Sequence, residues 1–214
     1  MCDDINCCQC YKTKEYAFAF WDDLEENERW GKLEMAVDAT KKQVITYNGE
    51  IISAFFHAHS GGKTENVSTV WGGADLPYLQ SVETSGEDGY TQYSSTVTLT
   101  KEETLAKIRE KYPETVIDWN VENPVSITEY TESGRVKTIQ FGNTSISGVE
   151  ARTIFGLKSA KFNIEIGESV TFNVVGYGHG VGLSQTGADS MAKTGASAEQ
   201  IINHYYTGVK IENI

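Results

Sequence analysis

A glycine-rich segment with one histidine is the part of the sequence best suited to hold a ligand. It reads GYGHGVGLSQTGA, from Gly176 to Ala188, and has five glycines in thirteen residues. The glycine spacing differs from the GxGxxG of dinucleotide-binding loops and no Walker-type lysine is present, so we reject a phosphate loop. A structural turn explains one or two glycines, whereas five suggest that something approaches the backbone closely. We therefore expect the loop to form a wall of a ligand groove, with His179 either touching the ligand or holding the loop.

Two more histidines, His57 and His59, lie in the segment FFHAHSGGKTEN. Residues two apart on a strand share one face, so together with His179 they could form a three-histidine metal site. The alternative is one hydrogen-bonded histidine on a half-buried strand and one in a turn. Ser60 could serve as a nucleophile beside a histidine, but Ser60-Gly-Gly lacks the nucleophile-elbow pattern and no acid of a triad can be named.

All four cysteines lie in the first ten residues, MCDDINCCQC. A disulfide framework would be distributed along the chain, so this cluster is too local to be one. Thiolates this close together fit a metal ion, and soft ligands of this kind favour zinc. We therefore predict a structural zinc ion on Cys2, Cys7, Cys8 and Cys10, with free thiols or a local disulfide as the alternatives.

The elements that must position these residues are short strands with a few helices interleaved among them. Asn48-Gly49 predicts a β-hairpin, and further hairpins are predicted across Glu132–Gly134 and across Gly167. Helices are predicted over Leu24–Ala39, from the capping box Thr100–Glu103 onward, over Ser184–Lys193 and over Ala198–Tyr206. Because strands predominate and the helices do not follow a βαβ order, the sequence predicts an α+β fold.

Length and charge narrow the class of protein. A chain of 214 residues fits one large domain or two small ones, with a possible boundary near 90–124. The formal net charge of −12 is the opposite of the basic surface that nucleic-acid binding requires, so nucleic acid is excluded as a partner. No apolar run approaches the roughly 20 residues of a membrane span.

Several segments together resemble the stage II sporulation protein D (SpoIID) family, which also includes amidase enhancers. They are FHAHSGGKTEN, Val70-Trp71, LPYLQSV, ISGVEARTIFGLKS and GYGHGVGLSQTGA, and the resemblance runs from Cys2 to the C-terminus. It implies a SpoIID-like α+β fold and a location on the cell-wall side of the cytoplasmic membrane, anchored in that membrane at full length. The activity implied is a lytic transglycosylase that cleaves peptidoglycan glycan strands whose stem peptides have been removed, during engulfment of the forespore. The alternative is a non-enzymatic module of the amidase-enhancer type.

The resemblance also implies roles for individual residues. The family's catalytic acid is a glutamate in an Ala-Glu-Met-Pro context, which we expect upstream of residue 1, so that 1–214 would be the C-terminal part of the unit. Glu34-Met35 lacks the following proline, and the catalytic residue therefore stays unassigned. The implied glycan-binding residues are Tyr78, Gln80, His179, Ser184 and Gln185.

The resemblance gives each of these glycan-binding residues a role, and for Tyr78 an alternative stands beside it. Tyr78 would offer a ring for sugar stacking unless it is a core tyrosine, and Gln80 stands where the family often has a lysine. Ser184 and Gln185 would meet N-acetyl oxygens. Some relatives hold zinc in a stretch like Cys-Asp-Asp-x-x-His-Cys, where this chain has Cys7 in place of the histidine. The partners implied are glycan strands and other engulfment or wall-hydrolase proteins.

Overall fold

The computed structural model describes residues 12–19 and 23–214, which divide into two compact units. The first unit consists of Met1–Val44 and Glu212–Ile214, and the second of Ile45–Ile211. In the first unit, α1 (Lys14–Phe18) is followed by α2 (Asp23–Ala39), which confirms the helix predicted over 24–39.

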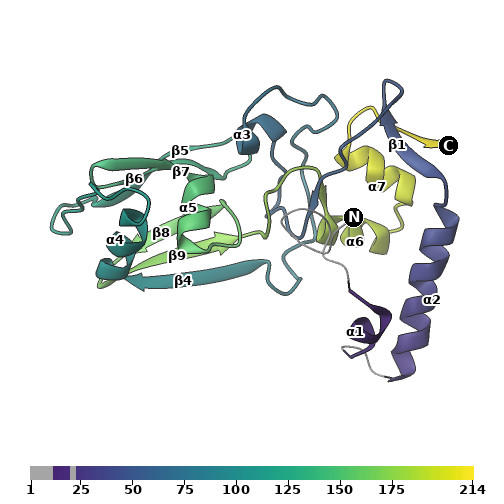
Figure 1. Cartoon of the computed structure of the whole chain (residues 1–214), viewed down its shortest axis with the longest axis horizontal. Helices are drawn as coiled ribbons and strands as arrows, with labels where there is room; N and C mark the ends of the chain where they lie inside the picture. Colours follow the sequence, from purple (N-terminus) through teal and green to yellow (C-terminus); the bar gives the residue numbers. More distant parts are fainter. Residues whose placement is uncertain (1–11, 20–22) are drawn as a thin grey trace. The chain divides into compact units, whose positions relative to one another are not determined.

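The larger hydrophobic core of the second unit forms where two three-stranded antiparallel sheets meet two helices (Figure 1). One sheet has the order β4-β9-β8 and the other the order β5-β6-β7. Helix α5 lies between the sheets in this view, and its Phe155 ring packs at 4.8 Å from Phe172 and at 5.3 Å from Phe141. The elements are β4 (Ser94–Thr100), α4 (Lys101–Arg109), β5 (Val125–Tyr130), β6 (Val136–Phe141), β7 (Thr144–Ser147), α5 (Gly148–Phe155), β8 (Phe162–Ile166) and β9 (Ser169–Val175).

Alternation along β9, the middle strand of its sheet, shows which face of the strand packs on the core. Val170, Phe172 and Val174 are buried while the residues between them are half-buried. A strand that alternates in this way presents one apolar face to the core, as its period of two requires.

A smaller hydrophobic core of the second unit is built around Leu79, Val181 and Tyr205. Here the short strands β3 and β10 pair in parallel, with Phe56 opposite Leu183 and residue 57 opposite residue 184. The elements of this region are β1 (Gln43–Tyr47), β2 (Glu50–Ile51), β3 (Phe56–His57), α3 (Val67–Trp71), β10 (Leu183–Ser184), α6 (Gln185–Lys193), α7 (Ala198–Tyr205) and β11 (Lys210–Asn213).

The predicted α+β fold, rich in strands, is confirmed: the described residues form seven helices and eleven strands in several small sheets. The hairpin at Asn48-Gly49 forms with both residues at positive φ, 51° and 82°. The capping box of α4 is present, with the Glu103 N–H bound to the Thr100 hydroxyl at 3.1 Å. A boundary near 90–124 stays a prediction. Within the described part of the chain, no helix is both long and apolar enough to cross a membrane.

Candidate functional site

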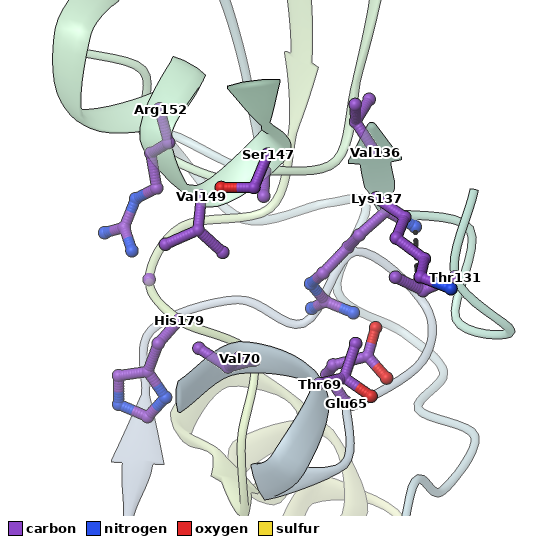
Figure 2. Close-up of a pocket in the computed structure, with 13 residues that line it drawn as sticks. Glu65, Thr69, Val70, Thr131, Val136, Lys137, Ser147, Val149, Arg152 and His179 are labelled. Carbon is purple, nitrogen blue, oxygen red and sulfur yellow. Dashed lines mark hydrogen bonds between the residues drawn. The ribbon is translucent and has the colours of Figure 1, made fainter. Parts of the chain in front are cut away.

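A small pocket in the second unit gathers residues from distant parts of the sequence (Figure 2). Ser147 immediately precedes α5, Val149 lies in its first turn and Arg152 in its last turn, and all three lie on one side in the view. Val70 of α3 and His179 of the glycine loop lie on the other side. The pocket encloses about 50 Å³, which is room for only a few water molecules.

Arg135 is the buried cation of this pocket, with 3% of its surface exposed. Its Nη1 donates to the Lys63 carbonyl at 2.9 Å and to Ser133 Oγ at 2.7 Å, and its Nη2 donates to the Ser60 carbonyl at 2.7 Å. Burial lowers the pKa of Arg135 to about 10, while the negative charges of Glu65 and Glu87 oppose this shift. Arg135 is therefore still charged at neutral pH.

Glu65 is a buried carboxylate that lines the same pocket. Its Oε2 accepts the Ser133 hydroxyl at 2.6 Å, and its Oε1 accepts the N–H of Asn66 at 3.0 Å. Because Ser133 also accepts from Arg135, the hydroxyl links the carboxylate to the guanidinium. This linkage compensates part of the cost of burying both charges.

Arg152 brings a second guanidinium to the pocket from α5. It is half-buried, and its Nε donates to the Leu157 carbonyl at 3.4 Å, just beyond the left-handed Gly156 that ends the helix. Burial lowers the pKa of Arg152. A lowered value still leaves an arginine charged at neutral pH, since its ordinary pKa lies above 12.

The glycine loop is held against the segment 55–65 by backbone pairing along its length. Tyr177 and His59 exchange backbone hydrogen bonds at 2.9 and 3.0 Å, and the Leu183 N–H donates to the Phe55 carbonyl at 3.0 Å. A Cβ at Gly182 would collide with that carbonyl, and one at Gly180 would collide with the guanidinium of Arg135. These glycines are thus required by packing inside the protein, while Gly178 and His179 line the pocket.

His179 holds the loop through its ring nitrogens. Its Nδ1 accepts the N–H of Val181 at 3.1 Å, so the neutral ring carries its proton on Nε2. Burial and the nearby charge of Arg152 lower its pKa to about 4, although a backbone hydrogen bond to Phe56 opposes this. The ring is therefore uncharged at neutral pH and serves to position the loop.

The three-histidine metal site predicted as one possibility is wrong. Within residues 12–19 and 23–214, no three His, Cys, Asp or Glu side chains come together as a metal site would require. His57 faces His179, with ring centroids 5.6 Å apart, but His59 binds Thr186 Oγ1 at 2.9 Å and packs on Tyr93. The two histidines of the segment therefore contact different neighbours.

Glu87 is the centre of a second buried network, which we name the Glu87 network and which includes Ser60, Gly62, Ser184 and Thr186. The carboxylate accepts from the Ser60 N–H at 2.8 Å, the Ser60 hydroxyl at 2.6 Å, the Gly62 N–H at 3.0 Å and the Ser184 hydroxyl. Burial alone would raise the pKa of Glu87, but these hydrogen bonds hold it below its ordinary value. Ser60 thus has a carboxylate partner instead of a histidine, and the nucleophile hypothesis is not supported.

An exposed group of rings, here called the aromatic platform, adjoins the pocket. It consists of Phe55, Trp71 and His179, with ring centroids 4.9 Å apart for Phe55 and Trp71 and 5.0 Å for Trp71 and His179. Trp71 is 50% exposed and Phe55 is 38% exposed. A cluster of exposed aromatic rings in mutual contact is typical of a binding surface.

The structure places the other predicted glycan-binding residues in different settings. Tyr78 is in the smaller core, 9% exposed, and its hydroxyl accepts the N–H of Ser53 at 3.2 Å, so its ring has no open face for stacking. Ser184 is fully buried and caps α6, so its hydroxyl is occupied within the protein. Gln80 and Gln185 are exposed and do not line the pocket.

The remaining predicted residues lie elsewhere. Glu34 is on α2 in the first unit, where it accepts a hydrogen bond from Trp30 Nε1 at 2.7 Å. The predicted zinc ligands Cys2, Cys7, Cys8 and Cys10 lie outside the described residues, so zinc stays a prediction.

Sequence reasoning assigned no role to Arg135, Arg152 or Trp71. Trp71 and Arg152 belong to segments that carry the family resemblance, but a lone arginine or tryptophan in such a segment gives no indication of what it faces. The signal that could have found them is their rarity, because the chain has four arginines and four tryptophans.

Comparisons with known proteins give relatives that cover almost the whole chain. Stage II sporulation protein D of Bacillus subtilis (strain 168) is 34% identical over 210 residues, which are 98% of this chain and 59% of that protein. The protein of the same name from Bacillus amyloliquefaciens is 33% identical over 211 residues, with the same coverage. The amidase enhancer of Bacillus subtilis (strain 168) is 27% identical over 228 residues, 82% of this chain and 32% of that protein. No family model matches the chain.

These similarities define a class of proteins named for sporulation and for amidase enhancement. Within that class, the chain is a relative of stage II sporulation protein D, so the resemblance predicted from its motifs is confirmed. The chain spans about three-fifths of the length of the two sporulation proteins it matches.

Proposed function

We propose that this chain is the glycan-binding part of a peptidoglycan lytic transglycosylase of the stage II sporulation protein D type, acting on peptide-free glycan strands during spore engulfment. The observation that carries the proposal is the aromatic platform beside a pocket with two arginines, in a chain similar to stage II sporulation protein D over 98% of its length. The apolar face of a pyranose ring suits stacking on Trp71, and its hydroxyl and N-acetyl groups suit a polar rim.

The proposed reaction needs one carboxylic acid. The acid gives its proton to the glycosidic oxygen as the bond from that oxygen to C1 breaks. The C6 hydroxyl of the same sugar then attacks C1 and gives its proton to the carboxylate left by the acid, so that a 1,6-anhydro end forms without water. Among the described residues, Glu65 is the one carboxylate lining the pocket, and its two oxygens accept hydrogen bonds from Ser133 and Asn66. We therefore assign the role of acid to none of the described carboxylates and propose for this chain the binding and orientation of the strand.

The proposal places the protein on the cell-wall side of the cytoplasmic membrane, where peptidoglycan lies. Its macromolecular partners would be glycan strands and, during engulfment, other wall hydrolases. The formal net charge of −12 argues against nucleic acid as a partner.

Co-sedimentation with purified glycan strands tests the proposal. We expect the Trp71→Ala variant to bind at least about tenfold more weakly than the parent, because it removes the most exposed ring of the platform. Tyr130→Ala is the matched control, since Tyr130 is 53% exposed in the same unit but outside the platform. Binding by Trp71→Ala equal to that of the parent would contradict the proposal.

A second candidate function is that of an amidase enhancer, which the 27% identity to the Bacillus subtilis amidase enhancer favours. Because no acid is assigned to the described residues, neither function predicts 1,6-anhydro ends from this chain alone, and the two functions differ in their effect on an added amidase. An enhancer increases the peptide release by that amidase, which mass spectrometry of the released peptides measures, whereas the glycan-binding part of a transglycosylase leaves it unchanged.

A further inference from the structure

An open hollow on the surface of the second unit adjoins the pocket and shares Arg152 with it. It lies where α5 ends, and its volume is about 590 Å³, against about 50 Å³ for the pocket. Ligand sites usually enclose roughly 300–1,000 Å³, so a sugar ring fits the hollow and not the pocket. The residues that line the hollow are Arg152, Thr153, Gly156, Leu157, Lys158 and Tyr177.

Tyr177 presents an aromatic ring to this hollow. The residue is 40% exposed, while its backbone exchanges hydrogen bonds with His59 and so fixes its position. The ammonium of Lys158 lies 5.0 Å from the centroid of the ring and donates to Gln92 Oε1 at 2.8 Å. An exposed ring with a cation over one face suits stacking of the apolar face of a sugar on its other face.

Arg152 supplies the hollow with hydrogen-bond donors that a ligand can reach. Its Nε donates to the Leu157 carbonyl at 3.4 Å, and its two Nη groups have no hydrogen-bond partner among the described residues. Unlike the Nε of Arg135, those Nη groups are not buried. Together with the Lys158 ammonium, they can donate to the hydroxyl and acetamide oxygens of a sugar. The hollow therefore combines an apolar ring with accessible donors, as a sugar with an apolar face and a polar rim requires.

Arg152 also links the hollow to the aromatic platform. Its charge contributes to the low pKa of His179, and Tyr177 opposes the fall in the pKa of Arg152, so the guanidinium lies within electrostatic reach of both. Arg152 and His179 lie at the same end of the pocket (Figure 2), and Gly178 alone separates His179 from Tyr177 in the chain. One extended ligand can therefore contact the platform, Arg152 and Tyr177 in turn.

We infer that Tyr177, Arg152 and Lys158 form a second sugar subsite and, resting on the proposed function, that one glycan strand spans from the aromatic platform across Arg152 to Tyr177. A sugar ring stacks on Tyr177, and its oxygens accept from Arg152 and Lys158. Contact of one strand with both subsites favours long strands over short ones, because the second contact is intramolecular.

Binding of oligosaccharides of two lengths tests the inference. The probes alternate N-acetylglucosamine and N-acetylmuramic acid without peptides, contain two or eight sugars, and carry the same fluorescent label. We expect Tyr177→Ala to bind the eight-sugar probe at least about tenfold more weakly than the parent does, and the two-sugar probe equally well, because two sugars reach only the platform. Trp71→Ala should weaken the binding of both probes.

Tyr177→Phe and Tyr130→Ala are the controls. Tyr177→Phe keeps the stacking ring, so it should bind the eight-sugar probe as tightly as the parent. Tyr130→Ala removes a ring that is 53% exposed in the same unit but does not line the hollow, so it should also leave binding unchanged. Thermal melting of the three variants, each expected within a few degrees of the parent, confirms that they are folded.

The outcomes separate the inference from the proposed function. The second subsite is wrong, while glycan binding stands, if folded Tyr177→Ala binds the eight-sugar probe as the parent does or weakens both probes by the same factor. It is also wrong if the parent binds glycan strands but binds the eight-sugar probe no more tightly than the two-sugar probe. If the parent binds neither the probes nor glycan strands, the proposed function fails and the inference fails with it.

Discussion

Two buried polar networks meet at Ser60, whose carbonyl accepts from Arg135 and whose hydroxyl donates to Glu87, and they differ in one respect. In the Glu87 network, the carboxylate accepts from Ser60, Gly62 and Ser184, and all of these donors come from the protein. In the pocket, Arg135 is equally buried but retains an Nε donor without a partner among the described residues. We call the Glu87 network closed because donors of the protein bind its carboxylate, and the Arg135 network open because its Nε lacks a partner among the described residues.

The difference separates a buried carboxylate that stabilises the fold from a buried guanidinium that lacks one hydrogen-bond partner. A fully satisfied network holds segments in place, here residues 60–62 against the start of α6. In the second network the Arg135 Nε donor has no partner among the described residues and under 1 Å² of accessible surface, so it adds a cost to folding. Variants of the closed network should therefore change stability, whereas variants of the exposed rings of the aromatic platform should change binding.

The largest stability effect is expected for Glu87→Ala. The change leaves the Ser60 and Gly62 N–H groups and two hydroxyls without their acceptor in a buried place, so we expect a loss of roughly 3–5 kcal/mol in unfolding free energy. Urea denaturation followed by circular dichroism measures it. A loss below 1 kcal/mol would show that the network is not the scaffold described above.

A smaller loss of unfolding free energy, roughly 2–4 kcal/mol, is expected for Gly182→Ala. The new Cβ would collide with the Phe55 carbonyl at the pairing of β10 with β3, at a residue whose φ is +71°. Gly195→Ala is the control, since Gly195 also has positive φ but no atom within 4 Å of the added Cβ. The control should cost only about 1 kcal/mol. Equal losses for the two variants would contradict the close packing of the loop.

For each histidine and pH unit the expected change in stability is smaller still, and this pH dependence is assigned to two histidines. Burial and the nearby His179 and Arg135 lower the pKa of His57 to about 3, and the pKa of His179 is about 4. Since the unfolded chain binds protons below pH 6.5 and the folded one does not, stability is full above pH 6.5 and falls as the pH drops toward 4.

The slope of unfolding free energy against pH measures how many histidines contribute to the pH dependence. Each contributes up to about 1.4 kcal/mol per pH unit within the window. His57→Leu should remove one of the two contributions, and urea denaturation at pH 7, 6 and 5 gives the slope. An unchanged slope in this variant would show that His57 takes up a proton in the folded protein.

Local signals in the sequence predicted most of the fold correctly. The hairpin at Asn48-Gly49, the capping box of α4 and the helix over 24–39 each depend on neighbouring residues, and all three form. Such features are determined by backbone conformation and side chains a few residues away, which the sequence displays directly.

The site was harder to predict because its residues meet only through the tertiary fold. The sequence left open whether Tyr78 stacks on sugar or is a core tyrosine, and it is in the smaller core, while Trp71 is exposed beside His179. The five glycines were expected to serve a ligand, yet Gly180 and Gly182 are explained by contacts with Arg135 and Phe55. Close approach to the backbone was predicted correctly, but the approaching group is largely the protein itself.

The most direct test of the open pocket is an NMR titration of the arginine Nε–H signals with peptide-free glycan strands. The chain has four arginines, of which Arg109 provides an internal reference because its Nε donates to the Thr115 carbonyl outside the pocket. We predict that the Nε–H signals of Arg135 and Arg152 shift in proportion to bound strand, while that of Arg109 does not. Saturable binding that leaves the Arg135 and Arg152 signals unmoved would contradict the proposal that glycan binds beside this pocket.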